Sequence, residues 1–277
     1  MHLAFKVARG NESRLLNVPL QTPNSSGQDL RILDLGCGMG IWLLDIAEQY
    51  PNTEYLGVDF CAMEPPALLN NVTIRSEVDY EEFWDFDEHL HSWDFIHLQK
   101  ALGSVSNWGQ IYFNILLHLK PGTGWFESVE IDLTPRCDDD SLRPGMLSQW
   151  YEYINQAYDM AGRSITYNEN TGTDLEQAGF TDIRHERCFL PLNGWPHDRK
   201  DHTTGMGYNI ALSPGENKTG GYGMDAMSVA PLTRVLQWPV ERAHQLCEDA
   251  LSQASDTNVK VYNWLHVWSA RAPEAAA

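Results

Sequence analysis

Short apolar runs alternate with stretches of helical periodicity from Arg31 onward. Five runs have the length and the β-branched or aromatic content of buried strands: RILDL (31–35), TEYLGVD (53–59), VTIRS (72–76), WDFIHL (93–98) and GWFESVEIDL (124–133). Between them, IWLLDIAEQY (41–50) and VSNWGQIYFNILLHLK (105–120) repeat apolar residues every three or four positions, and a proline follows each. Strands that alternate with helices predict a parallel sheet with helices on both faces.

After Pro135 the alternation becomes less regular. Four helical patterns are expected, at 147–161, 173–179, 226–237 and 240–254, and two further strands at 180–192 and 259–271. The segments GWPHDRK (194–200) and LSPGENKTGGYG (212–223) resemble Gly/Pro-rich loops.

The predicted organisation is one α/β domain that carries two insertions. A lead-in segment occupies residues 1–30 and is expected to be a loop, and a short tail follows at 273–277. The domain spans 31–272. Within it, insertions at about 136–168 and 194–257 are expected to fold together as a lid.

Composition narrows the class of protein. The 277 residues carry a formal net charge of -19, which argues against nucleic-acid binding and against an anionic membrane surface, because both need clustered Lys and Arg. The five cysteines are widely spaced, without a zinc-ligand or disulfide pattern, so no metal is expected. No signal peptide or membrane-spanning run is found, which predicts a cytoplasmic protein.

The stretch ILDLGCGMG (32–40) carries the clearest chemical signal. Its glycines, Gly36, Gly38 and Gly40, follow the first predicted strand, where an open parallel sheet binds its ligand. The dinucleotide fingerprint G-x-G-x-x-G would place a third glycine at Ile41 instead of Gly40, so the spacing disfavours a diphosphate. Asp34 lies two residues before the turn, where a carboxylate suits a cationic amino group.

Acidic residues also follow the next two strands. Asp59 ends the second strand, where a carboxylate accepts both hydroxyls of a ribose. Glu77 and Asp79 follow the third, and either is suited to an adenine amino group. A cationic amino-acid tail, a ribose and an adenine together describe S-adenosylmethionine. The alternatives are another nucleotide, or a tight turn that only packs a helix on the sheet.

The chain also resembles a known family. ILDLGCGMGIWLLDIAEQYPNTEYLGVD, WDFIHLQ, HLKPGTGW and FLPLNGWP are similar to motifs of fungal class I methyltransferases of the LaeA-like branch, over about Arg31 to Ala272. The resemblance implies a Rossmann-like seven-stranded sheet whose last strand is antiparallel, an S-adenosylmethionine cofactor and a role in secondary metabolism. This chain has Cys37 and Met39 where the family usually has threonine, and Gln99 where it usually has arginine.

The candidate cofactor-binding residues are those of the turn and of the strand ends: Asp34, Gly36, Cys37, Gly38, Gly40, Asp59, Phe60, Glu77, Asp79, His97 and Gln99. The resemblance favours Glu77 over Asp79 as the adenine-side acid. Cys37 is expected to contribute its backbone and not its thiol.

Three residues are candidates for proton transfer at the acceptor. His97 lies near the end of the fourth strand, although a structural or cofactor-contacting histidine is the alternative. Glu127 and Glu130 lie in the fifth strand, three positions apart, so at most one of them faces the site.

The acceptor is expected to be a small, largely apolar molecule such as a secondary-metabolite intermediate. Aromatic and methionine residues of the insertions suit such a pocket, and the candidates for contact with it are Trp108, Trp150, His202 and Tyr208. Two alternatives remain: a non-methylating enzyme that catalyses a cyclisation or rearrangement, and a regulatory protein. A homodimer is also left open.

Overall fold

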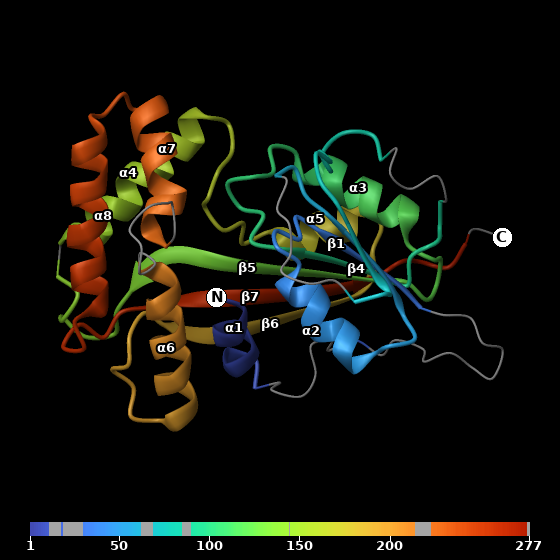
Figure 1. The fold of residues 1–277 in the computed structure, drawn as a ribbon, viewed down its shortest axis with the longest axis horizontal. Helices are drawn as coiled ribbons and strands as arrows, with labels where there is room; N and C mark the ends of the chain where they lie inside the picture. Colours follow the sequence, from blue (N-terminus) through green and yellow to red (C-terminus); the bar gives the residue numbers. More distant parts are fainter. Residues whose placement is uncertain are drawn as a thin grey trace.

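A seven-stranded sheet forms the centre of the computed structural model, which describes residues 1–10, 18, 30–61, 69–84, 90–143, 145–213 and 223–275 (Figure 1). The strand order is β3-β2-β1-β4-β5-β7-β6. Strands β1 to β5 run parallel to one another, and β7 is antiparallel to both β5 and β6. The strands are β1 (Arg31–Leu35), β2 (Glu54–Val58), β3 (Val72–Arg75), β4 (Phe95–Gln99), β5 (Trp125–Arg136), β6 (Thr181–Pro191) and β7 (Tyr262–Arg271). This arrangement confirms the predicted fold class.

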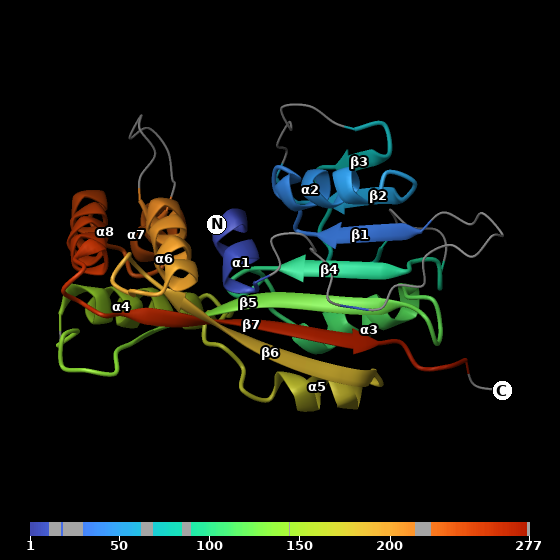
Figure 2. The ribbon, with the colours of Figure 1, turned by 90° about the horizontal axis from the view of Figure 1, so that it is seen from below.

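Eight helices surround the sheet. They are α1 (His2–Ala8), α2 (Ile41–Gln49), α3 (Trp108–His118), α4 (Met146–Met160), α5 (Thr171–Ala178), α6 (Arg199–Leu212), α7 (Met224–Arg234) and α8 (Val240–Ser255), as far as the chain is described. Helices α3 and α5 cover one face of the sheet, whereas α1 and α2 cover the other (Figures 1 and 2).

The core divides according to these faces. Leu33, Leu35, Ile96 and Phe126 pack with α3 and α5, whereas Ile32, Phe95 and Trp125 pack with α2. Because side chains alternate along each strand, neighbouring residues enter different clusters. Helices α4, α6, α7 and α8 form a third cluster with α1 at the far end of the long strands β5, β6 and β7 (Figure 2).

Two helices differ from the sequence expectations. Residues His2–Ala8 form α1, although the lead-in segment was predicted to be a loop; the rest of that segment lies almost wholly outside the described residues. Residues Arg199–Leu212 form α6, which the glycines and the weak apolar periodicity of this stretch concealed. Asp198 caps α6 by accepting hydrogen bonds from two backbone N–H groups of its first turn. The stretch 214–222 lies outside the described residues.

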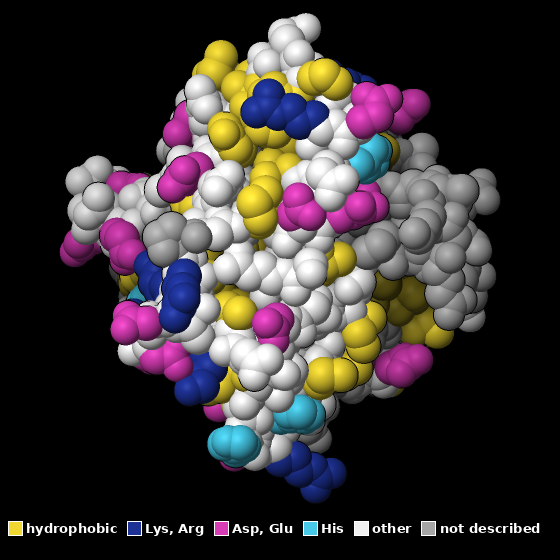
Figure 3. Space-filling view, turned by 90° about the vertical axis from the view of Figure 1, so that its left-hand side faces the viewer, with side chains coloured by type: hydrophobic (Ala, Val, Ile, Leu, Met, Phe, Trp, Pro, Cys, Tyr) yellow, Lys and Arg dark blue, Asp and Glu magenta, His cyan; other side chains and the backbone are white. Residues whose placement is uncertain are grey.

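Helices α4, α6, α7 and α8 form an end of the molecule whose surface mixes apolar and charged side chains. In Figure 3, apolar side chains occur in small groups between acidic and basic ones. No helix in the described part of the chain combines the length and the apolar character needed to cross a bilayer.

Gly205 allows α6 to pack closely against the backbone that follows β6. A Cβ at this position would collide with the carbonyl group of Asn193, whereas a Cβ at Gly207 would meet the Cβ of Ala4 at an ordinary 3.5 Å. We expect Gly205→Ala to lower the free energy of unfolding by about 1–3 kcal/mol, because backbone cannot move aside as a side chain can. Chemical denaturation measures this change.

Gly207→Ala is the matched control. It should be neutral or stabilise the protein by up to about 1 kcal/mol, since alanine is the better helix former. Equal effects of the two substitutions would contradict the proposed close packing at Gly205.

Candidate active site

The glycine turn between β1 and α2 is held by the neighbouring strand end. Gly36, Gly38 and Gly40 all have positive φ, between 58° and 71°, which side-chain-bearing residues rarely adopt. The Asp59 carboxylate accepts hydrogen bonds from the N–H groups of Gly38 and Cys61, both at 2.8 Å. Asp59 therefore fixes the turn as well as presenting a carboxylate beside it.

A cavity of about 390 Å³ opens at these strand ends, and we call it the strand-end cavity. Its lining comprises Gly36, Asp59, Phe60, Val78, Asp79, Tyr80, Glu81, Gln99, Lys100, Ser104 and Arg163. Asp79 is thus in the cavity wall, whereas Glu77, the acid that the family resemblance favoured, is exposed and is not among the lining residues. Four of the remaining candidates, Gly36, Asp59, Phe60 and Gln99, line the cavity together.

Sequence reasoning missed six residues of this cavity: Val78, Tyr80, Glu81, Lys100, Ser104 and Arg163. Lys100 follows β4 directly, so its place at a strand end was a usable signal. Burial lowers the pKa of Lys100. Tyr80 and Arg163 come from loops, and Arg163 pairs with Glu81 at 2.7 Å. No pattern in the sequence marked these loop residues.

Asp34, His97 and Glu127 form a buried row across three neighbouring strands. Their backbones are in register, and the His97 Nδ1 lies 2.8 Å from the Asp34 Oδ1. The Glu127 carboxylate accepts two hydrogen bonds from Arg9, at 2.7 and 3.0 Å. The His97 Nε2 is 3.9 Å from Glu127 and lacks a hydrogen-bond partner in the described structure. None of these four residues is in the wall of the strand-end cavity.

Further contacts hold His97 and Asp34 in place. The His97 ring stacks on Trp42, with ring centroids 3.9 Å apart. Burial raises the pKa of Asp34, while the contact with His97 opposes that rise. Asp34 and His97 therefore stabilise the strand ends beside the glycine turn, and neither lines the strand-end cavity.

Cys37 has its thiol turned toward the protein. Its Sγ lies near the backbone of Gly57, where a Cβ would come within 2.8 Å of it. Burial raises the pKa of the Cys37 thiol, so the group stays protonated and poorly nucleophilic.

A larger cavity of about 860 Å³ adjoins the strand-end cavity, and we call it the large cavity. Lys100 and Ser104 line both. The other walls are mainly apolar and include Met39, Leu102, Ile131, Leu133, Ile165, Tyr208, Leu212, Ala226 and Met227. Tyr208 is fully buried, and its hydroxyl donates to Asn263 at 3.3 Å.

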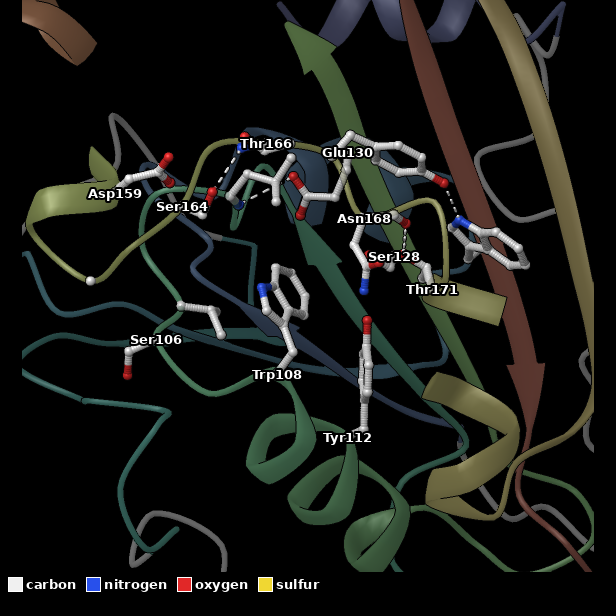
Figure 4. A pocket seen from close by; sticks show the side chains of 15 residues that line it. Ser106, Trp108, Tyr112, Ser128, Glu130, Asp159, Ser164, Thr166, Asn168 and Thr171 are labelled. Atoms are coloured by element: carbon white, nitrogen blue, oxygen red, sulfur yellow. Dashed lines mark hydrogen bonds between the residues drawn. The ribbon is translucent and has the colours of Figure 1, made fainter. Parts of the chain in front are cut away.

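A third cavity, of about 320 Å³, lies beneath the loop that joins α4 to α5 (Figure 4), and we call it the aromatic cavity. Trp108, Tyr112, Tyr167 and Trp268 contribute aromatic side chains to its wall. Glu130 lines both this cavity and the large cavity, so the two acids of β5 face different sites, as their spacing predicted.

Glu130 is the strongly perturbed acid of the region. Its carboxylate accepts hydrogen bonds from the backbone N–H groups of Ala101 at 2.7 Å and Leu102 at 3.3 Å. Burial nevertheless raises its pKa to about 8, from an ordinary value of 4.5.

Two predicted acceptor-contacting residues lie elsewhere. Trp150 is buried in the cluster formed by α4, α6, α7 and α8, and its indole N–H donates to Ser228 at 2.8 Å. His202 is exposed on α6. Neither is among the residues that line the three cavities, whereas Tyr208 lines the large cavity and Trp108 the aromatic cavity. No group of three or more metal-binding side chains occurs among the described residues.

Comparison with known proteins shows the family of this chain. A family model described as a methyltransferase domain matches residues 7–185. The secondary metabolism regulator laeA of Aspergillus fumigatus is 40% identical over 275 residues, which cover 99% of this chain and 69% of that protein. The regulator LAE1 of Cochliobolus heterostrophus is 39% identical, covering 99% and 85% of the two chains. The protein-methionine methyltransferase laeA of Emericella nidulans is 41% identical, covering 98% and 68%.

Solved structures share the fold at low sequence identity. Haemonchus contortus phosphoethanolamine N-methyltransferase 2, in complex with S-adenosylhomocysteine, superposes with a TM-score of 0.55 at 14% identity, covering 99% of this chain and 53% of that one. The [4+2]-cyclase SpnF superposes with a TM-score of 0.52 at 16% identity, covering 99% and 82%.

The sheet order, the glycine turn and the strand-end acids define a class I S-adenosylmethionine-dependent methyltransferase. The chain belongs to the LaeA-like branch of this family, in agreement with the family resemblance of its motifs. The strand-end cavity fits the cofactor, because it combines the turn with the carboxylates of Asp59 and Asp79 at the ends of β2 and β3. When bound, the cofactor supplies an electrophilic methyl group.

Loss of the Asp59 carboxylate should impair cofactor binding in two ways, because it removes a cavity acid and releases the Gly38 N–H. We expect Asp59→Ala to weaken the binding of S-adenosylhomocysteine at least about tenfold, as measured by calorimetry. Glu77→Ala is the control, since this exposed carboxylate does not line the cavity. Equal losses in both variants would contradict the assignment of Asp59.

Glu130 should make stability depend on pH. Its folded-state pKa of about 8 exceeds its ordinary value of 4.5, so the folded protein holds this proton more tightly than the unfolded chain does. The resulting stabilisation is complete below about pH 4.5 and is lost as the pH rises toward 8. We expect Glu130→Gln to flatten the fall in the free energy of unfolding between these pH values, by an amount on the order of a few kcal/mol.

Denaturation series across this pH range measure the effect, with Glu152→Gln on α4 as the control. Glu152 is exposed on α4, so its substitution should leave the pH profile unchanged. A Glu130→Gln profile parallel to that of the wild type would contradict the raised pKa.

Proposed function

We propose that the chain methylates a small, largely apolar acceptor that enters the large cavity. The observation that carries this proposal is the shared wall: Lys100 and Ser104 border both the strand-end cavity and the large cavity. A methyl donor in the first cavity and an acceptor in the second are then close enough for direct displacement.

The lining of the large cavity supports an apolar acceptor. Its walls include Leu102, Ile131, Leu133, Leu212 and Met227, and such side chains bind apolar surface by excluding water. The volume of about 860 Å³ suits a molecule of several rings or a long chain. A secondary-metabolite intermediate has this character, and regulators of secondary metabolism are among the similar proteins.

Among the three candidate acids and bases, Glu130 is favoured for contact with the acceptor, because it borders the large cavity. His97 and Glu127 are favoured as positioning residues, since His97 is paired with Asp34 and Glu127 with Arg9. With a pKa of about 8, Glu130 is mostly protonated at neutral pH and is then a hydrogen-bond donor. The site therefore suits an acceptor that needs little help from a base.

A methionine side chain of a protein is the second candidate acceptor. One relative, 41% identical over 273 residues, is named a protein-methionine methyltransferase. A thioether attacks the methyl group with its own lone pair, and the products are a sulfonium and S-adenosylhomocysteine. No proton leaves the acceptor, so this reaction also needs no base.

Incubation with methyl-labelled S-adenosylmethionine and a cell extract separates the two candidates. Label that remains soluble after acid precipitation and enters an organic extract supports the small acceptor. Label in a precipitated protein, mapped to methionine by peptide mass spectrometry, supports the second candidate and contradicts the first. If no S-adenosylhomocysteine forms during the incubation, both candidate acceptors are contradicted.

Narrowing the large cavity should slow methyl transfer to the acceptor without affecting binding of the donor. Ala226 is exposed on α7 and lines this cavity, whereas Ala230 is exposed one helical turn away and does not. We expect Ala226→Trp to lower kcat/KM for the acceptor at least about tenfold, because the indole fills space that the acceptor needs. Affinity for S-adenosylhomocysteine should be unchanged.

Ala230→Trp is the matched control and should retain both activities. If Ala226→Trp methylates the acceptor as fast as the wild type does, the acceptor does not use the large cavity. If both variants lose activity, the effect comes from the helix and not from the cavity.

A further inference from the structure

The aromatic cavity has the features of a second ligand site, separate from the strand-end cavity. Trp108 and Tyr112 extend from the first turns of α3 toward Glu130 and Asn168, as Figure 4 shows. Ser128 and Glu130 come from β5, and Trp268 comes from β7. These side chains are therefore held by regular elements, which position them more firmly than loops do, while residues of the α4–α5 loop complete the wall.

Several polar groups of the cavity wall have hydrogen-bonding capacity to spare. Ser128 is only 2% exposed and Tyr112 only 3% exposed. Within the described structure, neither hydroxyl takes part in a hydrogen bond. By contrast, the Tyr167 hydroxyl accepts from the Trp268 indole at 2.8 Å. Hydroxyl groups inside a protein normally form hydrogen bonds, so those of Ser128 and Tyr112 are available to bind a ligand in the cavity.

The charges around the cavity select against anions. Glu130 and Asp159 contribute carboxyl groups to the wall, and none of the described lining residues is Lys, Arg or His. Aromatic faces together with carboxylates attract organic cations, because both present negative potential. The volume of about 320 Å³ suits a single ring or a short branched group.

We propose that the aromatic cavity binds a small organic cation, an alkyl- or arylammonium group, against the rings of Trp108 and Tyr112 and the carboxylate of Glu130. This site goes beyond the acceptor assigned to the large cavity, with which it shares Glu130 and Leu102. Glu130 also accepts hydrogen bonds from the backbone N–H groups of Ala101 and Leu102. A cation bound to its carboxylate therefore affects the segment that follows β4.

Binding of a cation should favour the ionised form of Glu130 and release its proton. The other titratable groups near Glu130 are Lys100 after β4, Tyr80 after β3, Tyr112 on α3, Asp159 on α4, and His266, its partner on β7. Burial raises the pKa of both tyrosines and lowers that of His266 to about 4. Burial also lowers the pKa of Lys100, so a comparison with Glu130→Gln is needed to isolate Glu130.

The test uses benzyltrimethylammonium, whose charge does not vary with pH, and benzyl alcohol as a neutral aromatic probe. Calorimetry is performed in saturating S-adenosylhomocysteine, so that the acidic strand-end cavity is filled. We expect the wild type to bind the cation at least about tenfold more tightly at pH 9 than at pH 6.5, because Glu130 ionises in this interval. Benzyl alcohol should bind at least about tenfold more weakly than the cation at pH 9.

Two variants locate the site. Glu130→Gln should weaken cation binding at pH 9 at least about tenfold and remove the rise with pH. Trp108→Leu should weaken it about fivefold and keep that rise, because the half-buried indole supplies a π face but no titratable group. Thermal unfolding verifies that each variant is folded.

Three results would overturn the proposal. They are failure of the cation to bind the wild type, benzyl alcohol binding as tightly as the cation, and full cation affinity in either variant. If Glu130→Gln does not fold, Trp108→Leu alone decides, since unchanged affinity in that variant excludes the aromatic cavity.

Discussion

The row of buried side chains at Asp34, His97 and Glu127 is the constraint around which the cofactor end of the sheet is organised. Ionisable groups without water must be paired, and each strand here supplies the neighbour that the next one needs. Arg9 completes the row through its two hydrogen bonds with Glu127, which tie the segment after α1 to the middle of the sheet. The glycine turn therefore follows a strand that this row holds against β4, while backbone pairing holds it against β2.

The strands and most helices could be predicted because each has a single dominant apolar periodicity. Helix α6 could not, because its buried face includes Thr204 and Gly205, whose contacts are made by small side chains and backbone. Likewise α1 has only seven residues, too few for a periodicity to be recognised. Its burial depends on contacts with α6, which are remote in sequence.

The site shows the same division. Residues next to strand ends, such as Asp59 and Asp79, could be proposed because topology places strand ends together. Arg163 comes from a loop that is distant in sequence, so its presence in the cavity wall could not be predicted locally. The His97 side chain is turned toward Asp34, and local sequence does not encode that orientation either. Sequence spacing did predict that Glu127 and Glu130 face different sides of the sheet. Only the packing reveals that Glu127 pairs with Arg9, whereas Glu130 lines both the aromatic cavity and the large cavity.

The two adjoining cavities draw their walls from different parts of the chain. The strand-end cavity uses residues between Gly36 and Ser104, with Arg163 added, whereas much of the large cavity comes from β5, α6 and α7. The match to the family model ends at residue 185, before both of these helices begin. Substitutions in α6 and α7 can therefore reshape the large cavity without changing any residue that lines the strand-end cavity.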